Sequence, residues 1–219
     1  MIKKQAPQKK KLTPEQMRRY GIIAAIVLVV GLTGTNIWLV KKVKVEKVMA
    51  AKQQEKSVGE AAIGGDFAGV DHNGQAFSFA QTGGKLRLVF FGFTHCPMIC
   101  PTSLATLSAV QDELGEAADK VTPVFVSVDP KRDTPEVVKS YISSFHPSMI
   151  GVTGDEAQMK EAAGAFKVFH SAGKKEADGS YNMDHSAYIY LMDGEGKYLK
   201  HFAYDAKAEA IVTAVQEYL

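Results

Sequence analysis

Twenty consecutive residues, Gly21 to Val40, carry no charged side chain, and this run decides how the rest of the chain can be organised. A helix of that length rises about 30 Å, the hydrocarbon thickness of a bilayer. A buried core helix is rarely apolar on every side, and a signal peptide has a shorter apolar region that ends at a small-residue cleavage site. This run continues instead into Lys41 and Lys42. We therefore predict one uncleaved transmembrane anchor at residues 21–40, rather than a core helix or a cleaved leader.

The charged residues are distributed unevenly around this run. Residues 1–20 carry seven Lys or Arg and one acid, residues 41–58 carry six lysines and two acids, and residues 59–219 carry a net charge of −8. We predict a basic arm at 1–20, a charged stalk at 41–58 and one globular domain at 59–219. The numbers of Lys and Arg on the two sides of the run are similar, so the positive-inside rule barely decides the orientation. The short basic arm favours a cytoplasmic N-terminus with the domain on the other side of the membrane. Phosphates would repel the acidic domain, which argues against nucleic-acid binding.

The residue pattern of the domain predicts an α/β fold with a mixed sheet. A hairpin turned at Asn73-Gly74 is expected at 67–79, and a second one, at 186–204, turns at DGEG. Between the hairpins we predict strands or extended segments at 86–93, 121–129, 149–154 and 167–171. The predicted helices are 103–114, 134–145, 155–166 and 206–219, and the last three have Thr134, Asp155 and Asp205 as N-caps. A β-α-β unit followed by β-β-α is the thioredoxin-type order, with the first hairpin and the 130–170 region as additions.

Cys96 and Cys100 are the only cysteines, and each is followed by proline. They lie between a predicted buried strand and a predicted helix, where the helix dipole stabilises thiolates. The four-residue spacing lets both sulfurs point the same way. A structural disulfide would close a very short loop and stabilise little, and two inert buried thiols are the other structural alternative. We favour thiol exchange or metal binding, and the cysteines alone leave that choice open.

A metal ion held by two thiolates needs further ligands. Soft sulfur selects Cu(I), and two cysteines with one histidine can also hold Cu(II) or zinc. His95 is adjacent to Cys96, and His185 precedes a predicted strand at an edge where loops gather. Residue types and spacing do not choose among the six histidines, which are His72, His95, His146, His170, His185 and His201.

Four segments together resemble the Sco (SenC) family: GFTHCPMICP (92–101), VSVDPKRDTPE (126–136), GVTG (151–154) and MDHSAYIYLMDGEGKY (183–198). The family consists of membrane-anchored, thioredoxin-like proteins that act in assembly of the copper A centre of cytochrome c oxidase. The resemblance implies that Cys96, Cys100 and His185 bind copper, as Cu(I) or Cu(II). Met98 stands where the family usually has an acidic residue, a change that bears on partner recognition or tuning of the metal.

The resemblance implies a metallochaperone rather than a turnover enzyme. Its partner would be the copper A subunit of cytochrome c oxidase, whereas the copper donor and the thiol reductant are not indicated. The implied location is the inner membrane of a bacterium, with the domain in the periplasm, or the equivalent mitochondrial membrane.

Two other functions use the same cysteines. The first is a membrane-tethered thiol–disulfide reductase with Cys96 and Cys100 as the redox-active pair, and the second is a peroxiredoxin-like peroxidase. Thioredoxin-like oxidoreductases generally place a cis-proline opposite their cysteines, but no proline follows Pro147. This absence favours copper binding.

Overall fold

The structure, a computed structural model, describes residues 63–219. The predicted arm, anchor, stalk and domain boundary at Gly59 lie outside the described residues and stay predictions. Within 63–219, no helix has the length and apolar composition needed to cross a bilayer.

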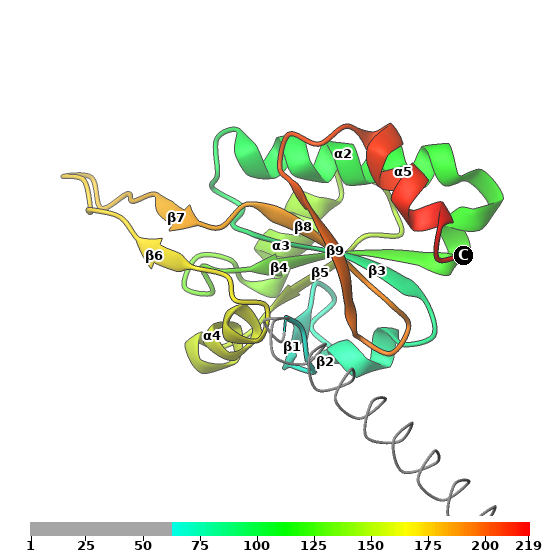
Figure 1. The fold of residues 1–219 in the computed structure, drawn as a ribbon. Coiled ribbons are helices and arrows are strands. Elements are labelled where there is room, and N and C mark those ends of the chain that lie inside the picture. Colours follow the sequence, from blue (N-terminus) through cyan, green and yellow to red (C-terminus); the bar gives the residue numbers. More distant parts are fainter. Residues whose placement is uncertain (1–62) are drawn as a thin grey trace, which may run out of the picture. The chain divides into compact units, whose positions relative to one another are not determined.

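A seven-stranded mixed sheet with the order β2-β1-β5-β4-β3-β8-β9 forms the centre of the domain. β3 pairs in parallel with β4 and β4 with β5, and the other neighbours are antiparallel. A separate two-stranded ribbon of β6 and β7 projects from the body of the domain (Figure 1). The strands are β1 (Ala68–Asp71), β2 (Ala76–Ser78), β3 (Leu86–Gly92), β4 (Val121–Ser127), β5 (Ile150–Thr153), β6 (His170–Ala172), β7 (Met183–His185), β8 (Tyr188–Met192) and β9 (Tyr198–Ala203). The predicted α/β class and both hairpins are confirmed.

Helices cover both faces of the sheet. Phe125 of β4 packs against Tyr141 of α3, whereas Phe91 of β3 faces the opposite way and packs against Phe166, which ends α4. The helix α5 lies beside α2 (Figure 1). Every residue of β3 is buried, which explains why all of them except Arg87 are apolar or glycine. The helices are α2 (Ile99–Leu114), α3 (Pro135–Ile142), α4 (Glu156–Ala165) and α5 (Ala208–Gln216), with short 3-10 turns η1 (Phe79–Thr82) and η2 (Gly115–Lys120).

Two of the three predicted N-caps are confirmed. The Thr134 side chain accepts a hydrogen bond from the Val137 amide, and Asp155 forms a capping box with Gln158. The prediction for Asp205 is wrong, because α5 begins at Ala208 and its N-cap is Lys207. That helix start has no side-chain cap, so burial of its apolar face decides where it begins.

Three differences from the prediction lie near the cysteines or in the ribbon that carries His185. α2 begins at Ile99, four residues before the predicted start, so Cys100 lies in its first turn. The extended segment predicted at 167–171 is wrong at its first residue, because Lys167 has a φ of 56°, and strand structure begins at His170. β7, which ends at His185, was not predicted at all.

Candidate metal site

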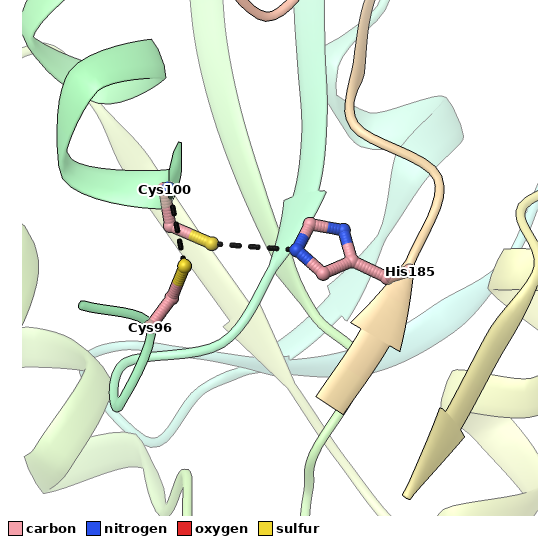
Figure 2. A group of neighbouring side chains, drawn as sticks. All are labelled: Cys96, Cys100 and His185. Atoms are coloured by element: carbon pink, nitrogen blue, oxygen red, sulfur yellow. Dashed lines mark hydrogen bonds between the residues drawn. The ribbon is translucent and has the colours of Figure 1, made fainter. Parts of the chain in front are cut away.

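Cys96, Cys100 and His185 come together from three places in the fold (Figure 2). Their candidate donor atoms all lie within 4.8 Å of one another. Cys100 Sγ lies 3.6 Å from His185 Nε2, and the Cys100 amide lies 3.4 Å from Cys96 Sγ. Within residues 63–219, no other group of three His, Cys, Asp or Glu side chains is close enough to share an ion.

The sheet and α2 hold the two cysteines at different depths. Cys96 lies in the loop after β3 and is partly exposed, whereas Cys100 is fully buried in the first turn of α2. Cys100 passes very close to the end of β3, where a Cβ on Gly92 would lie 2.8 Å from its Sγ. Only glycine at position 92 lets the sulfur occupy this place without displacement.

Aromatic rings and one backbone carbonyl orient His185. Its ring stands nearly perpendicular to the rings of Phe90 and Phe93, with centroids 6.1 and 5.8 Å away. Nδ1 lies 3.1 Å from the Ser186 carbonyl oxygen. Because a carbonyl only accepts, Nδ1 carries the proton and the Nε2 lone pair faces Cys100. This is the tautomer that a metal ligand needs.

The pKa values of the two thiols are shifted in opposite directions. Hydrogen bonding from the Cys100 side chain, with smaller contributions from the backbone, lowers the pKa of Cys96 to about 3, against desolvation, which raises it. The hydrogen bond to Cys96, followed by desolvation, raises the pKa of Cys100 well above its usual range. The reduced pair therefore carries one negative charge at neutral pH, on the sulfur nearer to solvent. Binding a metal ion through both sulfurs must release the remaining proton.

A buried carboxylate fastens the cysteine loop to the sheet. Asp133 accepts hydrogen bonds from the Thr94 amide at 3.1 Å, the Thr94 hydroxyl at 2.6 Å and the Ser127 hydroxyl at 2.7 Å. Desolvation raises the pKa of Asp133, and these hydrogen bonds oppose the rise. The role of Asp133 was not predicted, because it depends on three segments that meet only in the folded chain.

The remaining histidines lie outside the cluster. His95 is half exposed, and its Nδ1 lies 3.0 Å from the Thr94 hydroxyl and 3.8 Å from an Asp133 oxygen. His72, His146 and His201 contact Gly151, Ser148 and Tyr198, respectively, and His170 lies on β6. Of the six candidates, His185 is thus the one that the fold brings to both cysteines.

An open cavity of about 390 Å³ gives access to the cluster from solvent. Cys96 and His185 line it, together with the apolar side chains of Met98 and Phe169. Met98 is 69% exposed and Phe169 is 64% exposed. A second molecule can therefore reach Cys96 and His185 without any opening of the fold, and it would meet an apolar rim.

Comparison with known proteins identifies relatives over most of the chain. The profile of the family described as SCO1/SenC matches residues 55–219. A SCO2-like protein of Rickettsia felis is 40% identical over 192 residues, which are 87% of this chain and 93% of the relative. The human mitochondrial SCO2 homolog is 37% identical over 199 residues, 88% of this chain and 74% of the relative.

A solved structure shares the fold. Bradyrhizobium japonicum ScoI with copper bound superposes with a TM-score of 0.68 at 43% identity, over 72% of this chain and all of that one. The predicted thioredoxin-like fold is thereby confirmed for the described domain.

Proposed function

The chain belongs to the SCO1/SenC family, and we propose on that premise that it is a copper-binding protein of cytochrome c oxidase assembly. Cys96, Cys100 and His185 are the proposed ligands. The observation that carries the proposal is the convergence of their donor atoms to within 4.8 Å. The copper named for the ScoI relative supports the choice of ion.

The donor set suits copper in both oxidation states. Two thiolates and one imidazole satisfy Cu(I), which accepts three soft or borderline ligands. Cu(II) prefers a further ligand, and the open cavity beside Cys96 and His185 lets water or a partner supply it. The protonated Nδ1 of His185 keeps Nε2 available in either state.

We also propose that the protein delivers its copper to the copper A subunit of cytochrome c oxidase. The apolar rim of Met98 and Phe169 offers a surface on which that subunit can dock, directly beside the ligands. The proposed location is the inner membrane of a bacterium, or its mitochondrial equivalent, with anchor 21–40 holding the domain on the non-cytoplasmic side.

A thiol–disulfide reductase remains the second candidate function, because Cys96 is partly exposed and ionised. The Cys96 thiolate would attack a disulfide of the target and release one target thiolate. Cys100, after losing its proton, would then attack the mixed disulfide and release the second thiolate. The target gains two electrons, and Cys96 and Cys100 form a disulfide. An external thiol reductant must restore the pair.

Replacement of single histidines separates the two functions. We expect His185→Ala to lose stable Cu(II) binding in the full-length chain purified in detergent, and oxidase assembly in cells, because a ligand is removed from a three-ligand site. Disulfide reduction, which needs only the sulfurs, should fall by no more than about tenfold. Copper stoichiometry and visible absorption measure Cu(II) binding, oxidase activity of cells that carry the variant measures assembly, and a model disulfide measures reduction.

His95→Ala is the matched control, since His95 is adjacent to Cys96 but contacts Thr94. It should bind copper as the unaltered chain does. Loss of Cu(II) in His95→Ala with retention in His185→Ala would refute the proposed ligand set.

A further inference from the structure

A second cavity adjoins the candidate metal site beside the β6–β7 ribbon. Its volume is about 410 Å³, and Met183 lines both this cavity and the one that opens onto Cys96 and His185. Met159 of α4, His170 of β6 and Met183 of β7 are among the residues that line it.

The strand register puts most of these donors on one face of the ribbon. His170 pairs directly with His185, and Ala172 pairs directly with Met183. Directly opposed residues of an antiparallel pair project their side chains to the same side. His170, Met183 and His185 therefore share the face of the ribbon that lines the two cavities. Met159, which is 1% exposed, borders the second cavity from the body of the domain.

The oxygen ligands at this cavity are already engaged. Asp129 accepts hydrogen bonds from the Tyr181 hydroxyl and from Arg132 through its two oxygens. Glu156 forms an ion pair with Lys131 at 3.0 Å. A hard cation such as Mg²⁺ or Ca²⁺ thus finds no free carboxylate here. The Lys160 ammonium at the cavity opposes a cation in proportion to its charge, so a divalent ion is opposed more strongly than a monovalent one.

We propose that Met159, His170 and Met183 form a second, weaker site for a soft monovalent d¹⁰ cation, with Cu(I) as the natural ion. Thioethers are soft ligands that select Cu(I), and imidazole is a compatible third donor. The site lacks a thiolate and so lacks the charge that strengthens binding at Cys96 and Cys100. Met183 and His185, two residues apart on one face of β7, put the two sites next to each other. The inference is independent of the proposed function, because none of its three ligands belongs to the first site.

The test removes the first site and keeps the second. The full-length Cys96→Ser/Cys100→Ser variant, with ¹³C-labelled methionine methyl groups, is titrated with Ag(I), a d¹⁰ ion that does not change oxidation state. We expect one Ag(I) per chain to shift the methyl signals of Met159 and Met183 together. In this background, Met159→Leu and Met183→Leu should each weaken Ag(I) binding by more than about tenfold, and so should His170→Gln. Leucine keeps nearly the volume of methionine, so the fold should persist.

Two matched controls locate the effect. Met149→Leu changes a methionine that is equally buried and does not line the cavity, and Met98→Leu changes one that lines only the first cavity. Neither should alter Ag(I) affinity. The proposal is overturned if the Met159 and Met183 signals stay in place while Ag(I) is taken up, or if the serine variant takes up none. It is also overturned if Met98→Leu weakens binding as much as Met183→Leu, because the ion would then occupy what remains of the first site.

Discussion

At the scale of single residues, the site depends on where the proton of the cysteine pair resides. Hydrogen bonding lowers the pKa of Cys96 from 9.0 to about 3. An acid whose pKa is lower in the folded state stabilises the fold fully at any pH above its pKa in the unfolded state. This contribution is lost as the pH falls to its pKa in the folded state. The contribution of Cys96 to stability is therefore present above pH 9 and disappears progressively as the pH falls to about 3.

Alkylation of the reduced protein tests this assignment. Iodoacetamide reacts with thiolates, so the rate at Cys96 should be nearly constant from pH 8 to pH 5 and fall only as the pH approaches about 3. The rates are measured by mass spectrometry, which distinguishes Cys96 from the buried Cys100. In Cys100→Ala the hydrogen bond from the Cys100 side chain is gone. As the pH is lowered, the rate at Cys96 should therefore begin to fall at a higher pH than in the unaltered chain. A tenfold decrease per pH unit between pH 8 and pH 6 in the unaltered chain would show an ordinary thiol.

Gly92 provides the second residue-scale prediction. A methyl group there would lie 2.8 Å from Cys100 Sγ and 2.9 Å from a Phe90 ring carbon. We expect Gly92→Ala to lower the free energy of unfolding by about 1–3 kcal/mol, as overpacking does, and to weaken copper binding by displacing Cys100. Urea denaturation and competition with a Cu(I) chelator measure the two effects. In the control Gly164→Ala, the new methyl group meets nothing within 4 Å. That helical substitution should be neutral or slightly stabilising.

At the scale of elements, Asp133 joins the loop that carries Cys96 to the end of β4. Without its carboxylate, the Thr94 amide, the Thr94 hydroxyl and the Ser127 hydroxyl lose their acceptor. Unsatisfied buried donors cost about 1–3 kcal/mol each. We expect Asp133→Ala to lower the free energy of unfolding by at least that amount and to weaken copper binding, since Cys96 loses its support. Asp112→Ala removes a carboxylate that is 75% exposed and should change stability by less than about 0.5 kcal/mol. Equal stability of the two variants would mean that Asp133 supports nothing.

The elements also differ in how well the sequence predicts them. β3 and β4 are identified from apolar runs because both faces are buried, and Thr134 and Asp155 are found because a cap acts within three residues. The predicted extended segment at 167–171 overlaps only the start of β6, and β7 was missed, since each strand has three residues and a polar segment separates them. Long-range pairing decides such strands. The same limit applies to the site. Cys96 and Cys100 are evident from their spacing, whereas His185 required the family resemblance because it meets Cys100 only across 85 residues of folded chain.

At the scale of the whole molecule, function depends on which side of the membrane the domain occupies. The basic arm has seven Lys or Arg, the stalk has six lysines, and the domain from 59 onward has a net charge of −8. The positive-inside rule counts Lys and Arg close to the span, and the two flanks carry nearly equal numbers of them. The orientation is therefore sensitive to the charge of the arm. We predict that the arm stays in the cytoplasm and that the domain is exported.

Protease added to intact spheroplasts should therefore digest residues 63–219 while a tag fused before Met1 stays protected. Replacing the seven basic residues of the arm with glutamine should convert part of the population to the opposite orientation, because the six lysines of the stalk then dominate. The matched variant with glutamine at the six stalk lysines should strengthen the original orientation instead. Immunoblots of the domain and of the tag, before and after detergent lysis, score both sides. A domain that resists protease until the inner membrane is broken would put Cys96 and His185 in the cytoplasm, away from a copper A subunit on the other side.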